Sequence, residues 1–277
     1  MEDREPDTEL PFPVQPRHGA ARAPEMTAAM VRRALVEGRV TAAVQPVVEA
    51  RSVSRAAFHE ALMRIRTPGG SLLPPGQFLP AVQDPDLVSA LDRMVLSLVL
   101  ERLSARPDAR IAVNVSGPTT CDPDWLALLS RAVKRTPDVG FRLIVELNEQ
   151  EAVWTRPSCG QFLTALRDMG VSIALDDFGA GATGFSCFRE QRFDIVKIDG
   201  SYGDGLDRDR DAQALVRAMV DIARHFEMLT VIEFIASSAD ARRAMIMGMD
   251  CMQGHLFGRP GAELDQPYSP RALRRFG

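Results

Sequence analysis

The chain has 277 residues, of which 45% are apolar and 25% are charged, and its formal net charge is −4. This composition is ordinary for a globular protein with a sizeable core, and the negative balance disfavours a surface that coats DNA. The longest apolar run is shorter than the 18 residues of a membrane helix, and the four cysteines lack metal-ligand spacing, so we expect no membrane insertion and free thiols in a reducing cytoplasm.

The N-terminal part of the chain divides into a tail and a first set of regular elements. Residues 1–25 contain five prolines and many charges without periodicity, which predicts a flexible tail. A helix is then expected over 26–38, an apolar strand over 41–48, and a segment at 58–65 that leads into a Pro/Gly-rich loop at 67–76. An amphipathic helix over 86–103 and a strand over 110–116 follow.

The same alternation of helices and strands continues to residue 260. The strands are apolar without polar alternation, which is typical of a parallel sheet covered on both faces by helices. Seven or eight such units favour a closed α/β barrel of the (β/α)8 or TIM type over 26–262, ahead of an open doubly wound sheet, and 263–277 is expected to be a second tail. The remaining helices are expected at 125–135, 161–170, 212–226 and 239–248, and the remaining strands at 141–149, 171–177, 193–199 and 229–234, with a last segment at 251–260.

Oxygen-bearing side chains stand at the ends of most of these strands. In a barrel of parallel strands those ends open onto one face, so the side chains should meet at one mouth. Carboxylate and amide oxygens without His or Cys favour Mg²⁺ or Mn²⁺. Adjacent Asp176 and Asp177 repel each other by about 4 kcal/mol at an effective dielectric of about 20, and two metals sharing one carboxylate would supply the missing positive charge. The strand-end residues are Glu60, Asn114, Glu146, Glu149, Asp176, Asp177, Lys197, Asp199, Glu233 and Gln253.

Six short motifs in a fixed order resemble those of the EAL-domain family, the cyclic di-GMP phosphodiesterases. They are HEALMR from residue 59, NVS from 114, ELNE from 146, DDFGAG from 176, KID from 197 and QGHLFGRP from 253. The resemblance covers about residues 40 to 260. It implies a modified TIM barrel with one antiparallel strand, and hydrolysis of cyclic di-GMP to linear pGpG with two Mg²⁺ or Mn²⁺ ions per site.

The resemblance also implies a role for each site residue. Lys197 would orient the attacking water, and Glu149 would anchor the mobile loop that starts at Gly179, Ala180 and Gly181 and couples metal occupancy to dimer contacts. The first metal would be held by Glu60, Asn114, Glu146 and Asp176, and the second by Asp176, Asp177 and Glu233. The expected catalytic residues are Glu233, Lys197 and Asp177, and the expected substrate-binding residues are Arg64, Gln253 and Gln45.

One stretch departs from the family pattern. Where the family reads AEGVE, residues 232–236 read IEFIA, so Glu233 is retained while Phe234 replaces a glycine and Ala236 replaces a glutamate. A missing carboxylate can weaken metal binding, and two interpretations therefore stay open. The chain is either an active phosphodiesterase or an EAL-like receptor that binds cyclic di-GMP and signals through a protein partner, and a homodimer is compatible with both.

Overall fold

The computed structural model describes residues 26–149, 157–181, 185 and 187–264. The expected tails at 1–25 and 263–277 lie outside these residues, apart from residues 263 and 264. The strands of the described part are β1 (Val40–Glu49), β2 (Ser52–Arg66), β3 (Leu72–Leu73), β4 (Ile111–Val115), β5 (Leu143–Asn148), β6 (Ser172–Phe178), β7 (Ile195–Ile198), β8 (Leu229–Ile232) and β9 (Cys251–Gln253).

Helices alternate with these strands along the chain. The α-helices are α1 (Ala28–Val36), α2 (Pro85–Ala105), α3 (Pro123–Arg135), α4 (Asp138–Arg142), α5 (Pro157–Asp168), α6 (Cys187–Glu190), α7 (Gly200–Gly203), α8 (Arg210–His225) and α9 (Ser238–Met247). Short 3-10 helices are η1 (Pro75–Gln77), η2 (Leu79–Ala81) and η3 (Pro118–Cys121).

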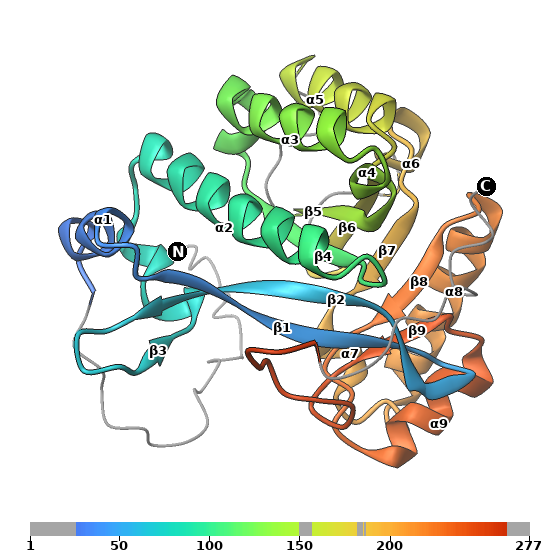
Figure 1. The fold of residues 1–277 in the computed structure, drawn as a ribbon. Coiled ribbons are helices and arrows are strands. Elements are labelled where there is room, and N and C mark those ends of the chain that lie inside the picture. Colours follow the sequence, from blue (N-terminus) through green and yellow to red (C-terminus); the bar gives the residue numbers. More distant parts are fainter. Residues whose placement is uncertain (1–25, 150–156, 182–184, 186, 265–277) are drawn as a thin grey trace, which may run out of the picture.

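Eight strands close into a barrel. From β2 through β4 to β9 each strand pairs in parallel with the next, while β1 pairs antiparallel with both β2 and β9 and so completes the ring. The two-residue β3 extends the free end of β2. This topology confirms the expected modified TIM barrel, with β1 as its antiparallel strand (Figure 1).

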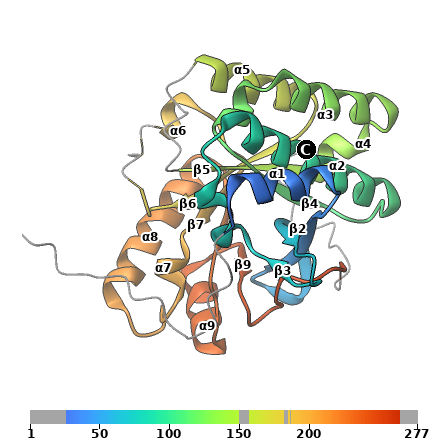
Figure 2. The same ribbon diagram turned by 90° about the vertical axis from the view of Figure 1, so that its left-hand side faces the viewer.

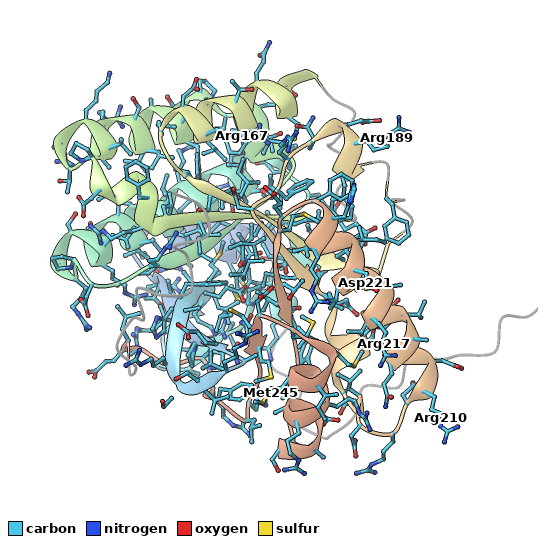
Figure 3. The ribbon with its side chains drawn as sticks, turned by 90° about the vertical axis from the view of Figure 1, so that its right-hand side faces the viewer. Arg167, Arg189, Arg210, Arg217, Asp221 and Met245 are labelled. Atoms are coloured by element: carbon cyan, nitrogen blue, oxygen red, sulfur yellow. The ribbon has the colours of Figure 1, made fainter. Side chains whose placement is uncertain are left out.

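The larger helices pack around the outside of the barrel (Figures 1 and 2). On α8, Val216, Met219 and Val220 are buried, whereas Figure 3 shows Arg210 and Arg217 pointing away from the barrel. This spacing of three to four residues is that of one helix face. Full burial of one such apolar side chain stabilises the fold by about 1.5–3 kcal/mol.

Several expected boundaries differ from the structure, and two of these differences have a clear physical reason. The strand expected at 141–149 begins only at Leu143, because the preceding residues form α4, where the Arg142 guanidinium donates to the carbonyl oxygens of Leu103 (2.8 Å) and Arg106 (3.1 Å). Strand β2 is much longer than the segment expected at 58–65, because β1 supplies a hydrogen-bonding partner along nearly its whole length.

Inward-facing side chains form two layers inside the barrel. The lower layer is apolar and buried, and it consists mainly of Val47, Phe58, Ala112, Ile144, Ala174, Ile195, Val231 and Cys251. Because side chains two apart on a strand point to the same face, the residue two positions nearer the mouth on each strand faces the same lumen. Those residues are Gln45, Glu60, Asn114, Glu146, Asp176, Lys197, Glu233 and Gln253. The apolar layer therefore forms the floor of a polar layer.

Candidate functional site

A buried lysine lies at the centre of the polar layer. The Nζ atom of Lys197 is 2.8 Å from Glu233 Oε1, 2.9 Å from Asp176 Oδ1, and 3.2 Å from both Glu60 Oε2 and Glu146 Oε2. The Lys197 side chain is fully buried, and the four carboxylates come from four different strands or strand ends. One ammonium thus faces four carboxylates away from solvent, which leaves an excess of negative charge.

These carboxylates form two groups that share one residue. Oxygen atoms of Glu60, Glu146 and Asp176 lie within 4.8 Å of one another, and the same limit holds for Asp176, Asp177 and Glu233. The two groups coincide with the carboxylates of the two expected metal sites, including the shared Asp176. Barrel geometry therefore brings together residues that are up to 173 positions apart in the sequence, from Glu60 to Glu233.

The excess of acid is visible in the protonation equilibria. Burial raises the pKa of Glu233 to about 8 and that of Asp177 to about 6, in the latter case with help from the Asp176 charge. Burial also raises the pKa of Glu146 well above its ordinary value. Burial alone would lower the pKa of Lys197, but the surrounding carboxylates outweigh it and raise that pKa well above the usual range.

Glu60 differs from the other acids because it collects the most hydrogen bonds. It accepts from Gln253 Nε2 at 2.6 Å, from Asn114 Nδ2 at 2.8 Å and from Lys197. Burial raises the pKa of Glu60, but the Lys197 charge and these hydrogen bonds together bring it below the ordinary value. Glu60 therefore carries its negative charge even without a metal.

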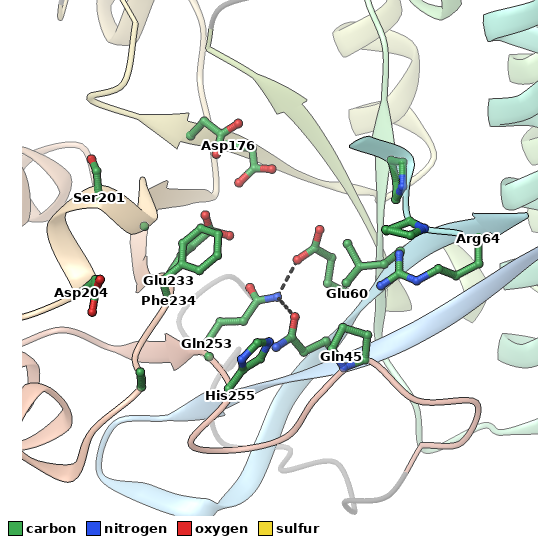
Figure 4. A pocket seen from close by; sticks show the side chains of 18 residues that line it. Gln45, Glu60, Arg64, Asp176, Ser201, Asp204, Glu233, Phe234, Gln253 and His255 are labelled. Carbon is green, nitrogen blue, oxygen red and sulfur yellow. Dashed lines mark hydrogen bonds between the residues drawn. The ribbon is translucent and has the colours of Figure 1, made fainter. Parts of the chain in front are cut away.

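The amides beside Glu60 form a short chain. Gln253 Nε2 also lies 3.3 Å from Gln45 Oε1, and Gln45 Nε2 donates to the Gly258 carbonyl at 3.0 Å. The antiparallel register of β1 places Gln45 opposite Glu60. Both glutamines line the same cavity as Glu60, so the structure places these two expected substrate-binding residues at the mouth (Figure 4).

The backbone that follows β6 is bound by the side chain of Glu149. Glu149 is buried, and its Oε2 accepts from the backbone N–H groups of Gly179 (2.8 Å) and Gly181 (3.2 Å). The Asp177 backbone adopts φ +54°, and Asn148 Nδ2 donates to the Asp177 carboxylate. The first residues of the expected loop are thus tied to Glu149, while residues 182–184 and 186 lie outside the described residues.

A cavity of about 800 Å³ opens above the acids, within the usual size range of ligand sites. Arg64 lies on one side, where its Nη1 donates to the Met63 carbonyl at 2.8 Å. Phe234, Ser201 and Asp204 lie on the other side (Figure 4). Ala236 also lines the cavity and is exposed.

The residues present fit divalent metal ions. Glu146 Oε1 is buried and has no hydrogen-bond partner among the described residues, which is an unfavourable state for a carboxylate oxygen unless a cation binds it. The donor set consists of carboxylates with an adjacent amide, the oxygen ligands that Mg²⁺ and Mn²⁺ prefer. Both observations agree with the charge excess around Lys197.

The sequence pattern did not single out one residue that contacts the site, and it included one strand-end residue that caps a helix. Asn148 contacts Asp177, yet a polar residue beside a strand end is too common for the pattern to single it out. Asp199, which also ends a strand, has a structural role instead, since its side chain accepts from Ser201 N at 2.9 Å and caps α7. Ser201 and Asp204 follow that cap and line the cavity.

Comparisons with known proteins agree with this geometry. A family model described as "EAL domain" matches residues 28–260. Cyclic di-GMP phosphodiesterase PdeF of Escherichia coli (strain K12) is 28% identical over 212 residues, which is 75% of this chain and 28% of PdeF. The chain thus spans less than a third of that relative.

Solved structures show the same barrel. The PaMucR phosphodiesterase in complex with c-di-GMP has a TM-score of 0.74 and 29% identity, over 83% of this chain and 95% of that one. The FimX EAL domain from Pseudomonas aeruginosa bound to c-di-GMP has a TM-score of 0.79 and 23% identity, over 87% of this chain and 98% of that one, and supports the fold alone. Within the described residues, none of the helices is long and apolar enough to cross a membrane.

Proposed function

The chain belongs to the EAL domain family, and from this premise we propose that it hydrolyses one phosphodiester bond of cyclic di-GMP to give linear pGpG. The observation that carries the proposal is the pair of carboxylate groups sharing Asp176 beside a buried lysine. Relatives named as cyclic di-GMP phosphodiesterases support the choice of substrate.

Two Mg²⁺ or Mn²⁺ ions would occupy the two carboxylate groups. The first would bind Glu60, Asn114, Glu146 and Asp176, and the second Asp176, Asp177 and Glu233. When bound, such a pair lowers the pKa of water and offsets charge on the phosphoryl oxygens.

Lys197 would act as a fixed positive charge. Its surroundings raise its pKa, so the ammonium keeps its proton throughout the physiological range. Because the Lys197 side chain is fully buried, its ammonium cannot turn toward solvent, and the surrounding carboxylates hold Nζ at the base of the cavity. A positive charge in such a position stabilises the negative charge that develops on a phosphoryl group, and it orients the attacking water through a hydrogen bond.

Arg64 and the two glutamines would bind the substrate. The Arg64 guanidinium is partly buried at the cavity wall and uses one nitrogen on the Met63 carbonyl, so further N–H groups can donate to a phosphate. Gln253 and Gln45 would keep Glu60 in place through their hydrogen-bond chain and contact the dinucleotide at the mouth.

The product decides between an enzyme and a receptor. We expect incubation with cyclic di-GMP and Mg²⁺ or Mn²⁺ to yield pGpG, detected by chromatography. The receptor is the second candidate because Ala236 and Phe234 stand at the cavity where the family pattern has a glutamate and a glycine. Binding of cyclic di-GMP without any pGpG would support the receptor, and absence of both binding and turnover would contradict both candidates.

A further inference from the structure

Phe234 has an unusual backbone. Its φ is +54°, in the left-handed region that favours glycine, and only three non-glycine residues in the described part of the chain have positive φ. For a residue with a Cβ this conformation costs roughly 1–2 kcal/mol. The flanking backbone imposes it, because Glu233 N donates to Ile198 O (3.2 Å) and Ile235 N donates to Gln253 O (3.0 Å).

The Phe234 ring is also unusually placed. It is 64% exposed, although it borders the buried acids and lines the cavity. The Cδ2 edge of the ring lies against Gly200, since a Cβ at Gly200 would fall 1.3 Å from Phe234 Cδ2. The chain therefore has a glycine where this ring needs room, and the ring lies at the side of the cavity beside Glu233 (Figure 4).

Strain and exposure together suggest a ligand for this ring. An aromatic side chain in a left-handed conformation, left open to water, contributes little to the stability of the fold, and strained residues concentrate at ligand sites. A purine base offers a flat apolar face, and stacking on an aromatic side chain is worth about 1–3 kcal/mol per base.

A hydrogen-bonding group lies on the same side of the cavity. Asp204 directly follows the short helix α7, and the first residue of α7, Gly200, contacts the Phe234 ring. Asp204 is exposed and lines the cavity with Ser201 and Phe234. A carboxylate can accept two hydrogen bonds from the N1–H and N2–H groups of guanine, which adenine lacks in that arrangement.

We infer that Phe234 stacks on one guanine base of cyclic di-GMP and that Asp204 accepts the N1–H and N2–H groups of the same base. This inference rests on the proposed function and adds the guanine subsite opposite Arg64. Phe234 is then a substrate-binding residue that this chain has in place of the glycine of the family pattern.

Calorimetry with cyclic di-GMP in EDTA, and again in Ca²⁺, measures binding without relying on turnover. We expect Phe234→Ala to weaken binding by about 10-fold or more, and Phe234→Tyr to stay within about 3-fold of wild type because it keeps the ring. Asp204→Asn should weaken cyclic di-GMP binding and reduce the preference for it over the inosine analogue, which lacks the N2 amino group. Phe141→Ala is the matched control, because Phe141 is 65% exposed and does not line the cavity.

A stability measurement separates stacking from a structural role. Phe234→Gly should bind as weakly as Phe234→Ala yet melt at the wild-type temperature or above, because glycine accepts the left-handed conformation. Glu227→Gly, at φ +59° and away from the cavity, should match that thermal effect without changing affinity. Wild-type affinity in Phe234→Ala would overturn the inference alone, whereas a wild type that does not bind cyclic di-GMP would overturn the proposed function as well.

Discussion

Replacing Lys197 by methionine tests the charge balance inside the barrel. Methionine keeps most of the length and apolar stem of lysine but removes the ammonium, so four carboxylates would remain without their shared cation. In EDTA at pH 8 we expect the variant to be much less stable than the wild type. The loss should be smaller at pH 5, because burial raises the pKa values of Glu146 and Glu233 and both can then hold a proton.

The contacts of Lys197 set the size of this effect. At separations of 2.8 to 3.2 Å, each ion pair is worth about 5–6 kcal/mol before desolvation, at an effective dielectric of about 20. Desolvation of five buried charged groups and repulsion among the acids cancel most of this attraction. Removing one partner from a buried pair typically costs about 3–5 kcal/mol, which corresponds to a Tm decrease of about 6–20 °C for a chain of this size.

Thermal melting in EDTA and in Mg²⁺ is the assay. Lys134→Met is the matched control, since Lys134 is the only other lysine and lies exposed on α3. Mg²⁺ should restore much of the stability of Lys197→Met by supplying positive charge, while pGpG formation should remain about 100-fold or more below wild type. Adding Glu146→Gln to Lys197→Met should recover part of the metal-free stability. If Lys197→Met and Lys134→Met melt alike in EDTA at pH 8, the four contacts do not stabilise the metal-free protein and our reasoning is wrong.

Four further outcomes are expected. EDTA should abolish pGpG formation, and Mg²⁺ or Mn²⁺ but not Ca²⁺ should restore it, because Ca²⁺ takes longer and looser coordination; turnover that survives EDTA would exclude the two-metal proposal. Glu60→Ala and Asp176→Asn should each abolish turnover while circular dichroism shows an intact fold, and unfolding of either variant would make that residue structural. Arg64→Ala should weaken cyclic di-GMP binding by about 1.5–3 kcal/mol in calorimetry, the range for hydrogen bonds to a charged group, and unchanged affinity would place the phosphate elsewhere. Because the pKa of Glu233 rises from 4.5 to about 8 on folding, the folded metal-free protein keeps a proton that the unfolded chain releases, so its free energy of unfolding should fall as pH rises from 4.5 to 8; flat melting temperatures in EDTA across that range would contradict the shift.

The strand-end acids could be predicted from the sequence because barrel geometry leaves them few alternatives. In a closed parallel barrel the carboxyl ends of the strands share one rim, so Glu146 and Asp176 had to approach each other once their strands were identified. Glu146 also shows which side of β5 faces the inside of the barrel. Because side chains alternate along a strand, Ile144 faces inward with Glu146, and Val145 faces outward. Motif order then supplied the remaining ligands.

Other features depend on contacts that a linear pattern does not contain. The position of Lys197 among four carboxylates results from the stagger of neighbouring strands, which no single strand encodes. The sequence does not reveal the left-handed backbone of Phe234 or its contact with Gly200, because both depend on the positions of β8 and α7. Strand β2 likewise owes its length to β1 rather than to its own pattern.

The two layers inside the barrel divide apolar support and polar chemistry between alternate positions of the same strands. Along the barrel strands the side chain in the apolar floor and the side chain in the polar layer are different residues, two positions apart. A substitution in the polar layer that keeps the charge balance around Lys197 can therefore change what the cavity binds while the apolar floor stays intact.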